Sequence, residues 1–362
     1  MKRLLCGRPA ITMPHGFYVG LILVFFKLLG YSNAALAVEW REDRPLSYRV
    51  VEGDTLWTIA GRFLKHAWEW PEVWRENAQI QNPDLIYPGD LIVLDARGGQ
   101  PYLRLEVSRM TGGVEDDRLS PRIRVTPLAE PIPVIPLKAI SPFLTRPRVI
   151  EIETLDHLPY VVGLAEEHVI GSPGDRLFVR SILKPTPVDY SIFRPGVEYR
   201  DPESDKVLGH EALFIAEGYL EQTGDPASVM LTRAEKEARP GDRLMPGQRV
   251  EIGEGYLPHA PRKGLAGHII GVMDGVSQIG QFSVVTLDRG AMNGVESGHV
   301  FEIWQKGPQI RDTVNPSFGQ KLIGPEQKAG ELMVFLTFRR VSFALVMNAE
   351  RFIHVLDVIR SP

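Results

Sequence analysis

The fold of the N-terminal region follows from the stretch Gly53-Asp54-Thr55-Leu56-Trp57-Thr58-Ile59-Ala60-Gly61-Arg62-Phe63-Leu64-Lys65, which follows the apolar strand segment 48–51 after one residue, Glu52. The glycine is typical of a strand end, and Asp54 or Thr55 can accept hydrogen bonds from the first backbone amides of a helix. Four apolar residues recur at the spacing of one helix face: Leu56, Ile59, Ala60 and Phe63. The stretch therefore predicts a strand followed by an amphipathic helix.

A second helix and a closing strand are predicted further along. Trp70-Pro71 can open a short helix, because proline is favoured at the first helical position, and Val73, Trp74 and Asn77 then share one side. The turn-rich segment 82–90 leads into the apolar segment 91–94. The expected order is strand, helix, helix, strand.

These residues resemble a LysM domain, the small βααβ module that binds N-acetylglucosamine-containing glycans. The resemblance joins an opening YxVxxGDTLWxIA to a closing NPDLIYPGDxIVL and covers about 47 of the 362 residues. It departs from the family in a longer, tryptophan-rich middle at 66–71. The resemblance implies peptidoglycan as the ligand, bound weakly by one module, so several copies would raise the avidity.

The glycan site would lie on the two loops that this topology brings together. Small loop residues leave backbone amides and carbonyls open to sugar groups, while aliphatic side chains cover the apolar faces of the ring. The expected site residues are Gly53, Asp54, Thr55, Leu56, Asn82, Pro83, Asp84, Leu85 and Ile86. We expect their polar side chains near the surface. The rings of Trp57, Trp70 and Trp74 are interpreted as core, with a reshaped sugar groove as the alternative.

The N-terminus has the features of an export signal. Basic residues at 2, 3 and 8 precede an apolar run over 17–29, and Ala35-Leu36-Ala37 gives a small-x-small pattern before Val38. A membrane anchor is the alternative, but Lys27 interrupts a run shorter than the roughly 20 residues that span a bilayer. We therefore expect a cleaved signal peptide at 1–37 and a periplasmic product.

Composition limits the possible partners and chemistry. Cleavage would remove the single cysteine, Cys6, and four basic residues, which leaves 37 basic against 45 acidic residues and a net charge of −8. An acidic chain is a poor nucleic-acid binder, and a chain without cysteine has no disulfide and no thiol nucleophile.

An unusual apolar, proline-rich segment follows the predicted module. Seven prolines lie between 121 and 147, interleaved with aliphatic residues. Flexible linkers are polar, whereas proline favours extended backbone. We interpret 96–147 as a strap packed against the downstream domain, with a partner-docking strip as the alternative.

From about residue 148 the sequence predicts antiparallel β structure that is duplicated. Short apolar runs alternate with Gly, Pro and Asp. Placing Val161 over Val285 sets 171–179 over 295–303 without a gap, and 212–216 and 229–231 correspond to 332–336 and 345–347. We predict two β subdomains, 148–252 and 264–362, each a small barrel or sandwich; coincidental turn chemistry is the alternative.

No catalytic constellation stands out. The histidines lack the HxH, HxxxH and HExxH spacings that aim ligands at one zinc ion. The segment 275–280 is not GxSxG, and the adjacent carboxylates Asp116-Asp117 and Glu166-Glu167 are typical of solvated turns. We expect no enzymatic activity, no metal and no cofactor.

The complete order of segments resembles the type IV pilus secretin-associated LysM protein family, and the C-terminal part is similar to the carboxyl domain of a flagellar outer-ring protein. The resemblance uses the LysM ends, the strap over 119–144 and the glycine-punctuated β region. It implies a periplasmic anchor that binds peptidoglycan and steadies an outer-membrane secretin, with copies arranged in a ring. The alternatives are a LysM-targeted wall-remodelling enzyme or activator, and a general wall-binding scaffold.

Overall fold

The computed structural model describes residues 38–74, 86–97, 100–106, 132–136, 139–140, 149–165, 170–182, 188–247, 256–273, 279–311 and 321–362. The predicted signal peptide at 1–37 lies outside this part of the chain. None of the helices within it has both the length and the apolar character that crossing a membrane requires.

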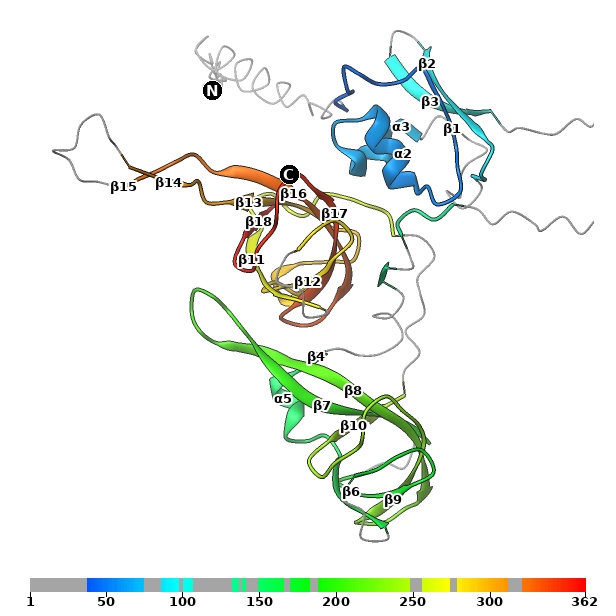
Figure 1. The fold of residues 1–362 in the computed structure, drawn as a ribbon, viewed down its shortest axis with the longest axis vertical. Helices are drawn as coiled ribbons and strands as arrows, with labels where there is room; N and C mark the ends of the chain where they lie inside the picture. Colours follow the sequence, from blue (N-terminus) through cyan, green and yellow to red (C-terminus); the bar gives the residue numbers. More distant parts are fainter. Residues whose placement is uncertain are drawn as a thin grey trace, which may run out of the picture. The chain divides into compact units, whose positions relative to one another are not determined.

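The first module has the predicted strand and helix order (Figure 1). Strand β1 (Ser47–Arg49) is followed by helix α2 (Leu56–Phe63), the 3-10 turn η1 (Ala67–Glu69), helix α3 (Trp70–Trp74) and strand β2 (Leu91–Arg97). The apolar face predicted for the first helix is buried, including Ile59 and Phe63 at 1% and 0% exposure. Strands β1 and β2 pair antiparallel, so the chain returns beside its starting strand.

A third strand, β3 (Gln100–Glu106), extends this sheet to the order β1-β2-β3. The prediction that these residues belong to the strap is wrong for this strand. Leu103 and Leu105 alternate toward the core at 1% and 4% exposure, while seven residue pairs join β3 to β2. Alternate burial of this kind is the signature of a strand with one covered face.

The described part of the strap contacts the module before it. The backbone amides of Leu56 and Trp57 donate to the carbonyl oxygens of Pro133 and Val134, and Ile132 donates to Ile86. The expected packing on the downstream β region is therefore wrong for residues 132–134, which lie against the helix-opening loop of the first module.

The first β region is built on a closed ring of pairings. Its strands are β4 (Val149–Ile150), β5 (Tyr160–Leu164), β6 (Arg176–Arg180), β7 (Asp189–Arg200), β8 (Val207–Gln222), β9 (Ala227–Ala234) and β10 (Arg243–Pro246), with the short helix α5 (Ile152–Leu155) after β4. The sheet order is β4-β8-β7-β10-β5-β6-β9, and an additional β8–β9 pairing closes six of these strands into a ring.

The second β region is a closed barrel of order β11-β12-β17-β16-β13-β18. Its strands are β11 (Ala266–Val272), β12 (Val284–Leu287), β13 (Val300–Gln305), β16 (Gln327–Thr337), β17 (Ser342–Ala349) and β18 (Val358–Arg360), and the 3-10 turn η4 (Ala291–Asn293) follows β12. A separate hairpin of β14 (Gln309–Arg311) and β15 (Lys321–Ile323) lies between β13 and β16.

The two rings have the same connectivity. Reading both in chain order, β5, β6, β7, β8, β9 and β10 occupy the ring positions of β11, β12, β13, β16, β17 and β18. The predicted correspondences of 212–216 with 332–336 and of 229–231 with 345–347 are right as to the strands, because they join β8 to β16 and β9 to β17. The residue match within the first pair is wrong, since the strand pairings place Ala216 at the position of Gly330. The predicted superposition of 171–179 on 295–303 is wrong by one strand, since it places β6 on β13 instead of β12.

One turn recurs before many of these strands, and it explains that slip. Asp90, Asp175 and Asp242 each stand directly before a strand, and a carboxylate oxygen of each accepts the amide N–H of the residue three positions earlier at 2.8–3.0 Å. The residue before each aspartate is a glycine with φ between +93° and +102°, a backbone region that side chains with a Cβ rarely adopt. A local match between two such turns therefore does not fix which strand follows.

Candidate functional site

The loop that opens helix α2 uses Asp54 internally. The Asp54 carboxylate accepts hydrogen bonds from the Val51 amide and from the Tyr48 hydroxyl, both at 2.9 Å, and the residue is 7% exposed. Burial of Tyr48, together with this hydrogen bond, raises the pKa of its phenol. The expectation that the Asp54 side chain lies near the surface is therefore wrong; it holds the loop in shape.

Thr55 is also committed to the fold. It is the N-cap of α2, its hydroxyl accepts from the Thr58 amide at 3.1 Å, and the Thr58 hydroxyl accepts from the Thr55 amide at 2.9 Å. The residue is 4% exposed, so the expectation of a surface side chain is wrong here too. This reciprocal pair satisfies two of the four backbone donors that every helix leaves free at its start, the Thr55 and Thr58 amides.

The other two free donors at this helix start are the backbone amides of Leu56 and Trp57. They donate to the carbonyl oxygens of Pro133 and Val134 at 3.1 and 3.3 Å, and the Ile59 amide makes the first intrahelical bond, to the Thr55 carbonyl at 3.0 Å. The Ile132 amide, just before Pro133, donates to the Ile86 carbonyl at 2.8 Å. The backbone groups of Leu56 and Ile86, two of the expected glycan ligands, are thus used by the strap.

The other expected site residues fall into two groups. Gly53 is exposed, has φ +90° and has open space around its Cα, so its backbone is accessible. Residues Asn82, Pro83, Asp84 and Leu85 lie outside the described part of the chain. The structure therefore brings together Gly53, Asp54, Thr55, Leu56 and Ile86.

The tryptophan rings belong to the core of the module. Trp57, Trp70 and Trp74 are 3–4% exposed, which agrees with the core interpretation. At this burial their faces cannot stack on a sugar without rearrangement. Leu56 and Ile86 are buried as deeply, at 1% and 0% exposure, so the described part of the expected site offers backbone groups and not these side chains.

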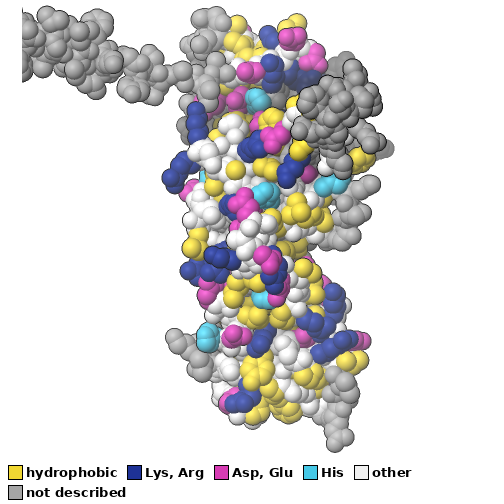
Figure 2. Space-filling model, turned by 90° about the vertical axis from the view of Figure 1, so that its left-hand side faces the viewer, with side chains coloured by type: hydrophobic (Ala, Val, Ile, Leu, Met, Phe, Trp, Pro, Cys, Tyr) yellow, Lys and Arg dark blue, Asp and Glu magenta, His cyan; other side chains and the backbone are white. Residues whose placement is uncertain are grey.

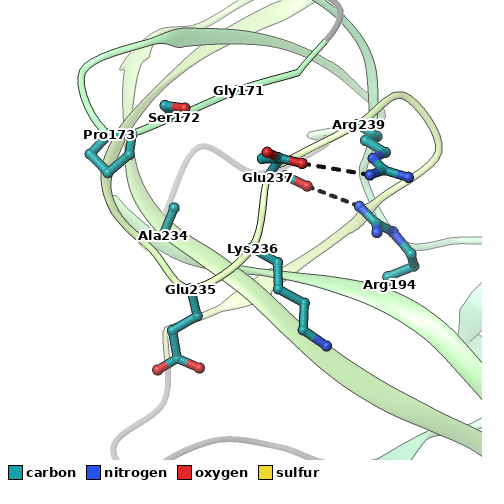
Figure 3. A pocket seen from close by; sticks show the side chains of 9 residues that line it. All are labelled: Gly171, Ser172, Pro173, Arg194, Ala234, Glu235, Lys236, Glu237 and Arg239. Atoms are coloured by element: carbon teal, nitrogen blue, oxygen red, sulfur yellow. Dashed lines mark hydrogen bonds and ion pairs between the residues drawn. The ribbon is translucent and has the colours of Figure 1, made fainter.

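A depression of about 470 Å³ in the first ring is a second place to look for a ligand (Figure 3). Its two arginines are already engaged. The Arg194 guanidinium bonds to both Asp242 oxygens at 2.7 and 2.9 Å and to the Glu237 carbonyl at 3.0 Å, and Arg239 lies 3.6 Å from the Glu237 carboxylate. These contacts commit the Arg194 guanidinium to the turn, whereas Arg239 makes one exposed ion pair with Glu237.

A third candidate site is the cluster of His259, Glu296 and His299 in the second β region. One possible ligand atom of each residue lies within 4.8 Å of the others. Nδ1 of His299 accepts the Glu296 amide N–H at 3.1 Å, so a neutral ring carries its proton on Nε2. Binding a metal through Nε2 would require the other tautomer and would break this hydrogen bond. We assign no metal to the cluster. Spacings between histidines alone do not reveal this cluster; its local signal is the Glu-x-x-His spacing of Glu296 and His299.

Charged side chains on the surface are largely interspersed, as the face in Figure 2 shows. Several form two-point ion pairs between strands or turns that are distant in sequence: Arg176 with Glu221, Arg180 with Asp225, and Arg360 with Glu326. Such exposed pairs contribute little individually to stability. They distribute charge of both signs across the β regions.

Comparison with known proteins identifies one segment. A LysM domain family model matches residues 48–95, the segment that runs from β1 to β2. This match suggests binding of peptidoglycan or another carbohydrate by the module. A search of curated proteins found no match to this chain.

Proposed function

We propose that the LysM module binds the N-acetylglucosamine-containing glycan of peptidoglycan through the loop that opens α2 and the segment that leads into β2. The observation that carries this proposal is the LysM match over 48–95 together with the adjacency of Leu56 and Ile86 around one bound segment. Backbone donors at the start of a helix suit the carbonyl oxygen of an acetamido group.

We further propose that the two ringed β regions hold an outer-membrane secretin of the type IV pilus machinery, so that the chain anchors it to the wall from the periplasm. The resemblance of the complete segment order to the secretin-associated family supports this. Retraction of a pilus loads the secretin, and a tether to a covalent network would distribute that load. Several copies in a ring would compensate for weak contacts by single modules. In this proposal the protein is a binding protein and not an enzyme.

A sedimentation assay tests the proposed binding to peptidoglycan. Residues 38–362 should pellet with purified peptidoglycan, whereas residues 149–362, which lack the module and the strap, should stay in the supernatant. Equal pelleting of the two proteins would contradict the division of labour.

A gene deletion in cells tests the proposed attachment to the secretin. Deletion should leave pilus subunits synthesised but reduce surface piliation, and a chain lacking 47–106 should give an intermediate phenotype because it still reaches the secretin. Normal piliation in the deletion, together with altered muropeptides, would favour the wall-enzyme alternative instead.

A further inference from the structure

A segment of the chain itself occupies the start of α2. Pro133 and Val134 supply carbonyl oxygens to the amides of Leu56 and Trp57, while the Ile132 amide donates to the Ile86 carbonyl. One short peptide therefore bridges the two loops from which the glycan site is built.

The segment is chemically suited to this place. Prolines at 133 and 136 have no N–H, so the sequence Ile132-Pro133-Val134-Ile135-Pro136 carries more acceptors than donors. The start of a helix offers the opposite, an excess of donors. Acceptor-rich peptide and donor-rich helix start complement each other.

Side-chain burial shows that the contact is more than two hydrogen bonds. Ile132, Val134 and Ile135 are 3%, 5% and 0% exposed. Isoleucine and valine withdrawn from water to this extent favour the docked arrangement through the hydrophobic effect. The strap is thus held by apolar burial and positioned by backbone hydrogen bonds.

The bound peptide and the proposed ligand present the same functional group. The acetamido substituent of N-acetylglucosamine is a secondary amide, with one carbonyl acceptor and one N–H donor, like a peptide unit. A glycan that uses the amides of Leu56 and Trp57 or the carbonyl of Ile86 would need the atoms that the strap now contacts. Both ligands cannot occupy these positions together.

We propose that residues 132–135 act as an internal competitor that covers the glycan site, and that glycan binds only when this segment leaves. This inference rests on the proposed glycan function of the module. Because the segment is part of the same chain, its effective concentration at the site is high. If the covered state holds about 90% of the molecules, the apparent dissociation constant for glycan is raised about tenfold.

The test compares glycan binding by strap variants in the chain 38–362. Val134→Asp with Ile135→Asp places two charges where two buried aliphatic side chains lie, so it should release the segment. Binding of a soluble hexamer of N-acetylglucosamine, measured by calorimetry, should become about tenfold tighter than in the unchanged protein. The matched control is Leu322→Asp with Ile323→Asp, which adds the same charge at exposed positions of β15 and should leave the affinity unchanged.

A milder variant guards against loss of folding. This variant carries three substitutions, Ile132→Ala, Val134→Ala and Ile135→Ala, which remove apolar contact without adding charge. It should also bind glycan more tightly than the unchanged protein, by a smaller factor than the charged variant. In a separate experiment, a peptide of residues 132–136 with blocked ends should lower glycan binding by the released variant, because it returns the competitor in trans.

The outcomes separate the two proposals. Equal glycan affinities in the unchanged and both strap-variant proteins would overturn the competition while leaving the glycan function intact. Absence of glycan binding in all of them, with the variants still folded by circular dichroism, would overturn the glycan function and the competition with it. Tighter binding in the released variant that the peptide reverses is the expected result.

Discussion

The two β rings share one connectivity but differ in the residues that make their turns. Before β10, Asp242 is 1% exposed and bonds to both Arg194 and the Arg239 amide. Before β13 the same turn position is His299, whose Nδ1 replaces the carboxylate oxygen. Before β18 it is Asp357, which accepts the His354 amide at 2.8 Å. The topology thus tolerates different acceptors as long as the amide three residues earlier is satisfied.

The rings also differ in the arms that leave them at the same point, between the third and fourth ring strands. In the first ring β7 and β8 continue as one long hairpin, whereas in the second ring the hairpin β14–β15 is separate (Figure 1). At the base of the second arm a Cβ on Gly307 would lie 2.0 Å from the Gly324 carbonyl oxygen, so the two backbones approach too closely for a side chain. The two rings therefore differ in how the chain continues between the third and fourth ring strands.

The largest effect should come from the core of one ring. Phe301 is completely buried in β13, and Phe301→Ala should lower the unfolding free energy by about 3–5 kcal/mol in urea denaturation. Hydrogen exchange should show lost protection in β11–β18 and retained protection in β5–β10, because each ring has its own core. Ile323→Ala, at an exposed position of β15, should change the unfolding free energy by less than about 0.5 kcal/mol. Equal loss of protection in both rings would mean that they fold as one unit.

The second effect concerns the ion pair that is specific to the first ring. Asp242→Ala should reduce the unfolding free energy by about 1.5–3 kcal/mol, since it leaves Arg194 and the Arg239 amide without their acceptor. Asp175→Ala, in the more exposed turn before β6, should cost only about 1 kcal/mol. Equal costs, measured by urea denaturation, would show that the arginine contributes nothing beyond the turn.

A pH effect should belong to the second ring. Burial lowers the pKa of His299, as does the neighbouring His259, against an opposite influence of Glu296. Above the unfolded pKa of about 6.5 both states are neutral and stability is complete. As the pH falls toward the lowered folded pKa, the unfolded state takes up a proton that the folded state refuses, so stability is lost.

The measurement is urea denaturation at pH 7.5 and pH 5.0, with hydrogen exchange assigning the loss to β11–β18. The expected loss is smaller than that caused by Asp242→Ala. His299→Asp supplies the carboxylate used by the other turns and should reduce the difference between the two pH values. If that variant keeps the full acid sensitivity, another group is responsible.

The smallest expected effect is a gain in stability. Leu356 occupies the turn position that is glycine before β6 and β10, and it has φ +76°. Left-handed backbone costs a residue with a Cβ about 1–2 kcal/mol, while glycine loses part of that advantage through its greater chain entropy. Leu356→Gly should therefore raise the unfolding free energy by about 0.5–1 kcal/mol, since the side chain is 58% exposed. Gly241→Leu in the first ring should destabilise.

The sequence predicted most of the first module, because its signals are local. Helix spacing at Leu56, Ile59 and Phe63 and the capping role of Thr55 depend on residues within one turn of each other. The sequence predicted a superposition of the two rings that is shifted by one strand. The reason is that the Gly-Asp turn recurs at Gly174 and Gly241 and carries no information about strand position.

The candidate site was predicted less well than the module around it. Asp54 and Thr55 were expected to face solvent because polar loop residues usually do, but their oxygens are needed by amides of the same loop. Occupation by Pro133 and Val134 could not be read from the sequence, since about 75 residues separate them from the helix start they contact. Long-range pairing of this kind leaves no spacing pattern.

Ring closure sets the order in which the β regions can form. The second ring closes through the pairing of Ala266 with Arg360 and the first through the pairing of Tyr160 with Arg243, so each closure joins strands that are more than 80 residues apart. Contacts this distant in sequence pay the entropy of loop closure before they gain any stability, which slows folding. Each ring therefore completes its native hydrogen bonding only when its sixth strand pairs with its first.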